Sequence, residues 1–348
     1  MARILYAASG DGYGHAVRLH SVGGGLIDRG HDVRFVSSTK TNAYLCEHFP
    51  DRVYEVFGLY TVYNQGKAEP LRTVWHNIRR AIQYVRPSRR GIRRLIREFK
   101  PDLILTDFEP FAAFWARAYG IPYVSLDNQH LLTHCELEHL PGFSLDWLNA
   151  YLTIRLYYGG AQRYLIPTFF EAPIRYQPTR LIPPILRPKV YRLQPTDDGF
   201  LLAYKGAGGE NDAMRLALER FDAVPVRAYG FGVIGQRGHV TFKETNGESF
   251  LHDLASCRAV VATAGHSLVC ECLHFGKPML LIPVRQQYEQ VLNAHHVERL
   301  GAGRSCRQLQ PRQIDEFLSE TNRFQAAIAS RSRASLDDVL DSVEAEIP

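Results

Sequence analysis

The sequence predicts an α/β protein with two doubly wound parallel sheets, one in each half of the chain. Short β-rich runs alternate with longer helical patterns, which is typical of parallel α/β architecture. Several of the runs are almost entirely apolar, as expected for strands that are covered on both faces. A chain of 348 residues, 45% of them hydrophobic, suits two domains with sizeable cores better than one.

The expected strands can be placed in chain order. In the first half we expect strands at 3–8, 33–37, 53–57, 102–106 and 122–126. In the second half we expect them at 199–204, 224–230, 238–243, 258–262 and 279–283. The runs at 122–126 and 279–283 both follow Gly-x-Pro, where the glycine ends a helix and the proline starts the strand.

A proline-rich stretch separates the two halves. Residues 178–195 contain five prolines in eighteen positions, a composition that indicates an extended connector. We therefore expect an N-terminal domain over 1–180, a linker over 181–195, and a C-terminal domain over 196–348 that ends in helices.

Composition argues against several classes of protein. The net charge of +5 is too mild to indicate nucleic-acid binding, and no apolar run approaches the roughly 20 residues of a membrane span. The N-terminus lacks the apolar core of a secretory signal. The six cysteines do not have the spacing of a disulfide framework. We expect a cytoplasmic protein with reduced thiols.

One segment is strongly basic. Residues 88–100 predict a helix capped by Ser88, with one apolar face formed by Ile92, Leu95, Ile96 and Phe99. The basic side chains Arg89, Arg90, Arg93, Arg94 and Arg97 lie off that face. Two interpretations stay open: a solvated helix face, or contact with an anionic membrane surface or a phosphate-bearing acceptor, on the inner face of the membrane. The cluster lacks the interleaved aromatic residues and reader motifs of nucleic-acid-binding modules.

The first predicted strand runs into a glycine loop, SGDGYGH, at residues 9–15. A dinucleotide fingerprint is disfavoured because the third glycine comes one residue early and no acid ends the second strand. No Walker A lysine is present either. The remaining interpretation is a glycine loop whose backbone a ligand can approach closely. His15 lies near the start of the following helix and is a candidate general base.

Polar residues end two further strands and should reach the same edge of the sheet. Asp107 ends the strand at 102–106 and is a candidate partner that orients His15, although a capping or turn role for either residue is an alternative. Asn128 and His130 follow the strand at 122–126. Together these strand ends predict a site.

The stretch 260–294 carries the stronger signal. A strand ends in Thr263-Ala264-Gly265 and a helix begins at His266-Ser267, so the helix N-terminus can bind anionic oxygens. Glu271 lies about one turn further along the same face, where it can accept from ribose hydroxyls. Glu289 and Gln290 follow the next strand and can bind sugar hydroxyls.

These motifs, in this order, resemble the GT-B fold glycosyltransferases, and within them the branch of the UDP-glycosyltransferases and the lipid II-forming N-acetylglucosaminyltransferase. The resemblance implies two Rossmann-like domains facing a cleft. It implies that His266 and Ser267 bind the diphosphate, Glu271 the ribose, and Glu289 and Gln290 the transferred sugar. The implied roles of the remaining residues are a second phosphate-side loop at Gly206, an acceptor-side wall at Gly12, Gly14, Asn128 and His130, a base at His15 and its orienting carboxylate at Asp107.

The chain departs from that family pattern in two ways. Plant UDP-glycosyltransferases stack a Trp on the uracil, but Trp75, Trp115 and Trp147 all lie in the first half. Base recognition then falls to the segment around Phe242 or to residues 229–231. The acid of the acid-Gln pair is Glu289 rather than Asp, which leaves the sugar open.

The pattern H-x₃-C-x-C-x-H at 266–274 contains residue types that bind zinc. On a helix Cys272 points about 200° away from Cys270, so four ligands cannot converge. No Asp-x-Asp pair is present to hold a metal-bridged diphosphate. We expect no metal and no resident cofactor, only a nucleotide-sugar co-substrate, UDP-linked by the resemblance.

The sequence therefore predicts a glycosyltransferase that moves a sugar to a hydroxyl acceptor with inversion and without metal. Two alternatives stay open. A nucleotide-sugar 2-epimerase shares the fold but needs no acceptor pocket. A non-catalytic nucleotide-sugar-binding protein would keep Glu271 without needing His15 and Asp107.

Overall fold

A computed structural model describes residues 1–10, 13–56, 58, 63–64, 67–68, 72, 75, 79, 89–140, 142–157, 159–206, 211–245, 247–284, 287–331, 333 and 335–348. The chain forms two compact units. The first comprises Met1–Arg187 together with Ala334–Pro348, and the second comprises Pro188–Arg333. No helix in the described part of the chain is both long enough and apolar enough to cross a membrane.

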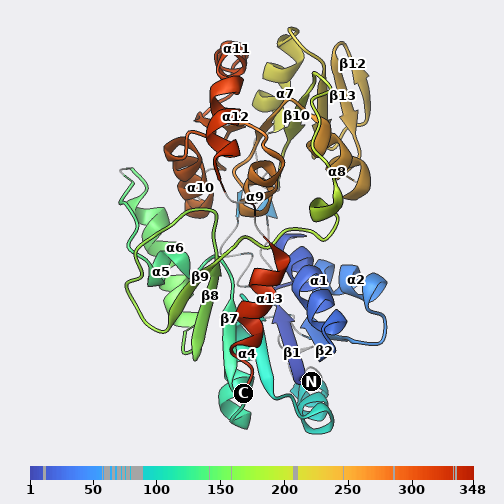
Figure 1. Ribbon diagram of the computed structural model, residues 1–348, viewed down its shortest axis with the longest axis vertical. Helices are drawn as coiled ribbons and strands as arrows, with labels where there is room; N and C mark the ends of the chain where they lie inside the picture. The colour runs from blue at the N-terminus through green and yellow to red at the C-terminus, as the bar shows by residue number, and fades with distance from the viewer. Residues whose placement is uncertain are drawn as a thin grey trace. The chain divides into compact units, whose positions relative to one another are not determined.

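The first unit is built on a seven-stranded parallel sheet in the order β3-β2-β1-β6-β7-β8-β9 (Figure 1). Its strands are β1 (Arg3–Ala8), β2 (Asp32–Ser37), β3 (Val53–Glu55), β6 (Leu103–Asp107), β7 (Tyr123–Leu126), β8 (Arg163–Pro167) and β9 (Thr179–Ile182). A separate antiparallel pair consists of β4 (Tyr63–Asn64) and β5 (Lys67–Ala68). Its helices are α1 (Tyr13–Asp28), α2 (Thr39–His48), a helix over 89–99, α4 (Pro110–Tyr119), α5 (Leu131–His134), α6 (Ser144–Tyr157) and α13 (Leu336–Glu344).

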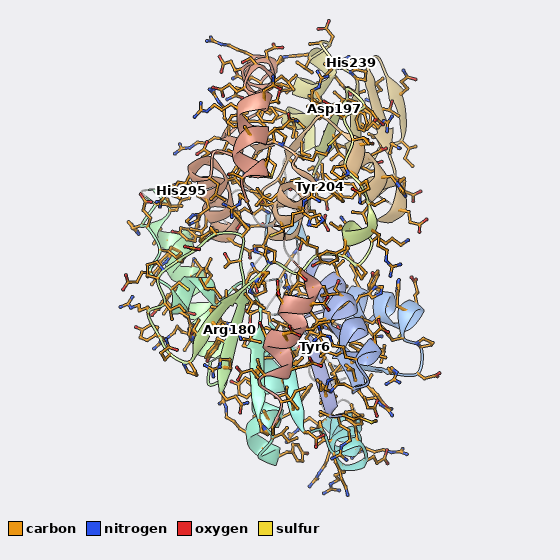
Figure 2. The ribbon with its side chains drawn as sticks, in the orientation of Figure 1. Tyr6, Arg180, Asp197, Tyr204, His239 and His295 are labelled. Carbon is orange, nitrogen blue, oxygen red and sulfur yellow. The ribbon has the colours of Figure 1, made fainter. Side chains whose placement is uncertain are left out.

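The core of this unit forms because the central strands are apolar on both faces. All five residues of β6 and all four of β7 are buried, and the ring of Tyr6 in β1 is fully enclosed (Figure 2). The apolar face of α1 packs in the same core as the apolar face of α13. At Gly25 a Cβ atom would lie 2.7 Å from Leu340 Cδ1, so the two helices approach closely there.

The second unit has a seven-stranded sheet in the order β12-β13-β11-β10-β14-β15-β16. Its strands are β10 (Leu201–Tyr204), β11 (Val226–Tyr229), β12 (Gly235–Arg237), β13 (Val240–Lys243), β14 (Ala259–Ala262), β15 (Met279–Leu281) and β16 (Gly303–Ser305), and only the edge pair β12–β13 is antiparallel. Its helices are η1 (Val190–Arg192), α7 (Asn211–Arg220), α8 (Gly247–Ser256), α9 (His266–Phe275), α10 (Tyr288–Arg299), α11 (Pro311–Ser319) and α12 (Thr321–Ala329).

In both sheets the order in which strands are added reverses beside the first strand. In the first unit the chain proceeds from β1 outward to β2 and β3, then returns to β6 on the other side of β1. In the second unit β10 is likewise flanked by β11 and β14. Ligands of open α/β sheets bind outside the carboxyl ends of the strands at such a reversal. The loops after β1 and β6, and those after β10 and β14, are therefore the candidate ligand-binding loops.

Every strand expected from the sequence is present, and the Gly-x-Pro interpretation is confirmed. Gly120 and Gly276 end α4 and α9 in the left-handed conformation, with φ of 65° and 72°, and the next strand begins three residues later. The sequence does not predict the strands β4, β5, β8, β9, β12 and β16.

The compact units differ from the predicted boundaries at two places. Strand β9 pairs with β8 across residue 180, so the first unit extends into the segment that was expected to be a linker. Helix α13 belongs to the first unit rather than the second, because its buried residues pack in the core of the first sheet. Neither tertiary contact, that of β9 with β8 or that of α13 with the first sheet, can be predicted from composition.

Candidate active site

The structure brings His15 and Asp107 together at the carboxyl edge of the first sheet. Asp107 is the last residue of β6, where it pairs in register with Ala8 of β1, and His15 lies in the first turn of α1. The distance from His15 Nδ1 to Asp107 Oδ1 is 2.9 Å. The side chain of Asp107 is fully buried, while that of His15 is 11% exposed. Gly14 precedes His15 in the same helix, and Gly12 lies outside the described residues.

A third residue, Arg18, completes this cluster and was missed by the sequence analysis. Its Nε and Nη2 groups each donate to a different oxygen of Asp107 over 2.8 Å, which is a bidentate ion pair. Its Nη1 group donates to Asn128 Oδ1 over 3.2 Å. The available signal was its spacing, because residues three apart on a helix share a face and Arg18 follows His15 by three.

The electrostatics of the cluster keep Asp107 ionised. Burial alone would raise the pKa of its carboxyl group, but the charge of Arg18, together with His15 and the hydrogen bonds from both, holds that pKa below its ordinary value. A buried carboxylate that carries this charge can stabilise a positive imidazole beside it.

The loop that follows Asp107 is conformationally unusual. Phe108 has a φ of 55°, in the left-handed region that bulky residues rarely adopt. Its ring stacks on that of His15 with an interplanar angle of 4° and 6.5 Å between ring centroids. Glu109 caps α4 by accepting from Phe111 N–H, and burial raises the pKa of its carboxyl to about 8.

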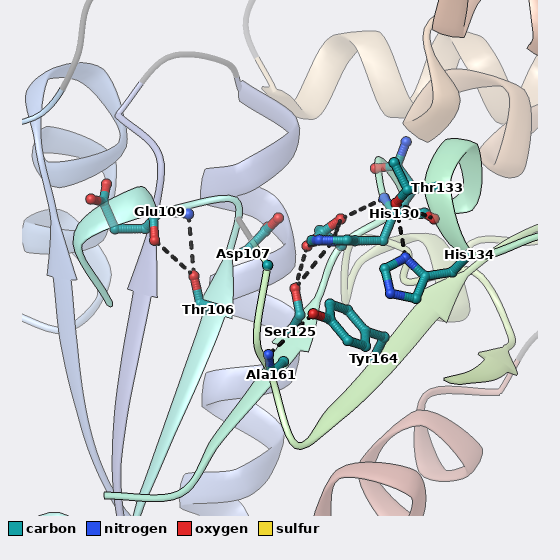
Figure 3. A network of polar contacts seen from close by, with 12 residues as sticks. Thr106, Asp107, Glu109, Ser125, His130, Thr133, His134, Ala161 and Tyr164 are labelled. Carbon is teal, nitrogen blue, oxygen red and sulfur yellow. Dashed lines mark hydrogen bonds and ion pairs between the residues drawn. The ribbon is translucent and has the colours of Figure 1, made fainter. Parts of the chain in front are cut away.

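The end of β7 carries a second buried His–Asp pair (Figure 3). His130 Nδ1 lies 2.8 Å from Asp127 Oδ2, and Ser125 Oγ donates to the same oxygen over 2.6 Å. Burial would raise the pKa of Asp127, but His130 and these hydrogen bonds lower it to about 2. His130 is 1% exposed and Asn128 is 6% exposed. Both predicted acceptor-side residues are thus buried, where they support the strand-end loops.

In the second unit, the loops after β10 and β14 are joined by a hydrogen bond. Gly206 N–H donates to Thr263 Oγ1 over 3.0 Å, and Thr263 N–H donates to the carbonyl of Tyr204, the last residue of β10 (Figure 2). A Cβ atom at Gly206 would lie 2.9 Å from Thr263 Oγ1, so this close approach requires glycine. Lys205 precedes Gly206 and lies beside the point where the strand order reverses, and the sequence analysis did not identify it. Burial lowers the pKa of its amino group.

The turn that precedes α9 has room beside it. Gly265 is extended, with φ of −67° and ψ of 134°, and no described atom lies within 4 Å of a Cβ built there. His266 and Ser267 are partly exposed in the first turn of α9, and Glu271 is buried one turn later at 2% exposure. The packing of the described residues thus does not require glycine at 265, whereas a ligand at the helix N-terminus would.

The zinc pattern at 266–274 does not form a cluster. Cys270 Sγ lies 3.7 Å from both ring nitrogens of His266, but Cys272 is fully buried. Across the described ranges no group of three or more His, Cys, Asp or Glu side chains is arranged to hold a metal ion.

Glu289 and Gln290 begin α10, but they differ in their surroundings. Glu289 is partly exposed in the first turn of the helix. Gln290 is 9% exposed, and its side-chain oxygen accepts from the backbone N–H groups of Ala264 and Val284.

The expectation for Phe242 needs correction. Its ring is 1% exposed in the hydrophobic core of the second unit, with its centroid 5.7 Å from that of Phe231. Tyr229 is fully buried as well, and its hydroxyl donates to Asp253. In β13 the buried positions alternate with period two, and Phe242 lies on the same inward face as Val240. These rings offer no face to a nucleotide base in this structure.

Comparisons with known proteins agree with this architecture. The sequence profile of glycosyl transferase family 1 matches residues 2–322. An uncharacterized glycosyltransferase of Methanosarcina acetivorans is 22% identical over 353 residues, which cover 87% of this chain and 85% of that protein. The UDP-N-acetylglucosamine–N-acetylmuramyl-(pentapeptide) pyrophosphoryl-undecaprenol N-acetylglucosamine transferase of Geobacillus thermodenitrificans is 37% identical over 115 residues, or 29% of this chain. This aligned segment spans 32% of that relative's length, about a third.

Solved structures extend the likeness to the whole chain. The glycotransferase of kitacinnamycin superposes with a TM-score of 0.71 and 17% identity, covering 100% of this chain and 99% of that one. MurG of Acinetobacter baumannii superposes with a TM-score of 0.61 and 16% identity, covering 99% and 100%. At these identities the likeness concerns the fold, and it confirms the two Rossmann-like domains of the GT-B class. Because the family profile covers most of the sequence, this chain belongs to glycosyl transferase family 1.

Proposed function

We propose that this protein transfers a sugar from a UDP-linked donor to a hydroxyl acceptor, with inversion at the anomeric carbon and without a metal ion. One observation carries the proposal: a member of a glycosyltransferase family places His15 against the buried carboxylate of Asp107 at the reversal point of its first sheet. A non-catalytic binder would not need this pair.

The hydrogen-bond geometry gives each member of the cluster a role. Arg18 Nε and Nη2 both donate to Asp107, and Nη2 also lies 2.9 Å from His15 Nδ1. We assign the Nδ1 hydrogen to His15, because Asp107 Oδ1 is a carboxylate oxygen 2.9 Å away that can accept from both His15 and Arg18. The Nε2 atom of His15 is then the basic nitrogen. It takes the proton of the acceptor hydroxyl as that oxygen bonds to C1 and the bond from C1 to the diphosphate breaks. A base of this kind contributes roughly 10²–10⁴-fold to the rate.

The donor would bind at the edge of the second sheet. The N-terminus of a helix offers backbone N–H groups and the positive end of the helix dipole, which suit the two phosphates of a nucleoside diphosphate, and α9 begins at this edge. Ser267 and His266 add side-chain donors there, and Lys205 adds charge that favours departure of the diphosphate. We assign Glu271, one turn further along α9, to the ribose, and Glu289, in the first turn of α10, to the transferred sugar.

A binding screen followed by a hydrolysis assay tests the proposal. Thermal unfolding with UDP-, GDP- and dTDP-sugars should show stabilisation by UDP-sugars. Release of UDP, with water as the acceptor, should then fall at least about 100-fold in His15→Ala, while donor binding is retained. The exposed His252→Ala on α8 is the matched control. Near-normal turnover in His15→Ala would contradict the assignment of the base, and a sugar epimerised on the nucleotide would indicate the epimerase instead.

We also propose an anionic lipid headgroup as a partner of the first unit. A groove of about 470 Å³ lies between the basic helix and α4, and Arg89, Arg90 and Arg93 line it together with Phe114, Trp115 and Tyr119. Phe114 is 57% exposed, and arginine beside exposed aromatic rings is typical of surfaces that bind at a membrane interface. The apolar face of this helix is buried as expected, which leaves its arginines exposed.

Sedimentation with vesicles tests this partner. The protein should sediment with anionic phospholipid vesicles at low salt and be released at high salt, and neutral vesicles should not retain it. The Arg89→Ala/Arg93→Ala variant should bind less, whereas Arg312→Ala, an exposed arginine on α11, should bind normally. Binding without salt dependence would contradict the proposal.

A further inference from the structure

Two side chains of α10 bind a single peptide segment in the turn between β14 and α9. The Ala264 N–H donates to Gln290 Oε1 over 3.0 Å, and Asn293 Nδ2 donates to the Ala264 carbonyl over 2.9 Å. Gln290 Oε1 also accepts from Val284 N–H over 3.1 Å, which joins the loop after β15 to the same point. Ala264 is fully buried, and Asn293 is 3% exposed.

The turn depends on these side chains because regular structure does not satisfy its backbone. Ala264 lies after the last residue of β14 and before the first residue of α9. Buried N–H and C=O groups must find partners, and for Ala264 both partners are amide side chains of α10 rather than backbone groups of a sheet or helix. Thr263, the preceding residue, is bound to the β10 side through Tyr204 and Gly206. The turn is therefore held from both neighbouring loops.

Gln290 has little capacity left for another ligand. An amide oxygen has two lone pairs, and both already accept from backbone N–H groups. Its Nε2 group donates to Gln287 Oε1 over 2.6 Å. The family resemblance assigns Gln290 to the transferred sugar, but in this structure its oxygen is committed to the turn.

We infer that Gln290 and Asn293 are positioning residues that hold the Thr263–Gly265 turn, so that the N-terminal N–H groups of α9 face a nucleoside diphosphate. The inference deepens the proposed function and rests on it for the identity of the ligand. It separates α10 into two roles: Glu289 for the sugar, and the Gln290–Asn293 pair for the diphosphate through the backbone.

Calorimetric titration with UDP and with UDP-N-acetylglucosamine distinguishes positioning from direct sugar contact. In Gln290→Ala and in Asn293→Ala, both ligands should bind more weakly by the same factor, about tenfold, because each variant leaves a buried backbone group unpaired. Glu289→Gln should weaken only the sugar nucleotide. His295 lies about 200° around α10 from Asn293, so His295→Ala should leave both affinities unchanged. Loss confined to the sugar nucleotide in Gln290→Ala, with unchanged affinities in Asn293→Ala, would overturn the inference.

Hydrogen exchange of the ligand-free protein supplies a readout that does not need the proposed function. The peptide that contains Ala264 should exchange faster in both alanine variants than in the wild type, while peptides from the first sheet should not change. Unchanged exchange in both variants would overturn the inference even if UDP binds. If the wild type binds no nucleotide, the proposed function fails and the exchange result alone decides the positioning role. Should Gln290→Ala fail to fold, Asn293→Ala carries both measurements, because it leaves the Gln290 contacts intact.

Discussion

The two units place different chemistry at the same topological position. At the reversal of the first sheet, charged side chains dominate: Asp107, Arg18 and His15 form a buried cluster. At the reversal of the second sheet, glycine, threonine and backbone N–H groups dominate, held by amide side chains. Side chains that titrate can move a proton, whereas a fixed row of N–H groups can bind an anion without changing its charge. The comparison predicts that substitutions in the first unit act mainly on rate and stability, and that those in the second act mainly on affinity.

The largest effect is expected from Asp107→Asn. UDP release should fall about 10²–10⁴-fold because His15 loses its charged partner, while nucleotide affinity should be unchanged. The variant also leaves Arg18 buried without its counter-charge, which costs about 3–5 kcal/mol of unfolding free energy.

A double variant separates these two losses. Arg18→Met/Asp107→Asn removes both charges, so chemical denaturation should show most of the stability recovered while the activity stays low. Recovery of activity in the double variant would contradict the role of Asp107 in orienting His15.

The next effect is a pH dependence of stability that originates in the first unit. The pKa of Glu109 is raised to about 8 in the folded protein by burial, above the ordinary value of about 4.3 in an unfolded chain. Between these values the unfolded chain releases a proton that the folded protein keeps, so stability is full below about pH 4 and falls as the pH rises toward 8.

Glu109→Gln removes this proton and keeps an oxygen that can accept from Phe111 N–H. Urea unfolding between pH 5 and pH 8 should show the wild type losing about 3 kcal/mol relative to the variant. Parallel pH profiles for the two proteins would show that Glu109 is ionised when buried.

A smaller effect, on affinity alone, is expected from Gly265→Val in the second unit. Valine readily adopts the extended backbone of residue 265, and no described atom would contact its Cβ, so the melting temperature should change little. The branched side chain would occupy the space beside the N-terminus of α9, so UDP should bind at least about tenfold more weakly. A variant that melts normally and binds UDP normally would place the nucleotide elsewhere.

These contrasts also explain how far sequence reasoning reaches. Apolar runs and Gly-x-Pro pairs are local signals, and they locate the central strands, with Asp107 at the end of β6 and His15 at the start of the helix after β1. The membership of β9 and α13 in the first unit is not predicted, because it depends on contacts with β8 and α1, which are distant in sequence. Arg18 was detectable from its helical spacing.

Gln290 and Phe242 show a different limit. An amide that binds a sugar and an amide that binds a peptide group look the same in a sequence, and only the contacts with Ala264 and Val284 separate them. An aromatic residue in a strand can face a ligand or the core, and Phe242 faces the core. Side-chain direction, rather than residue type, decides both cases.

The smallest effect tests whether the two loops of the second unit act as one binding surface. Thr263→Val keeps the shape of the side chain but removes the oxygen that accepts from Gly206 N–H. We expect a loss of about 1 kcal/mol in unfolding free energy and of about threefold to tenfold in UDP affinity, measured by denaturation and calorimetry. Thr263→Ser retains the hydroxyl and should recover most of the affinity. If the valine variant binds UDP as tightly as the wild type, the loop after β10 contributes nothing to the phosphate site, and the contrast between the two units would rest on α9 alone.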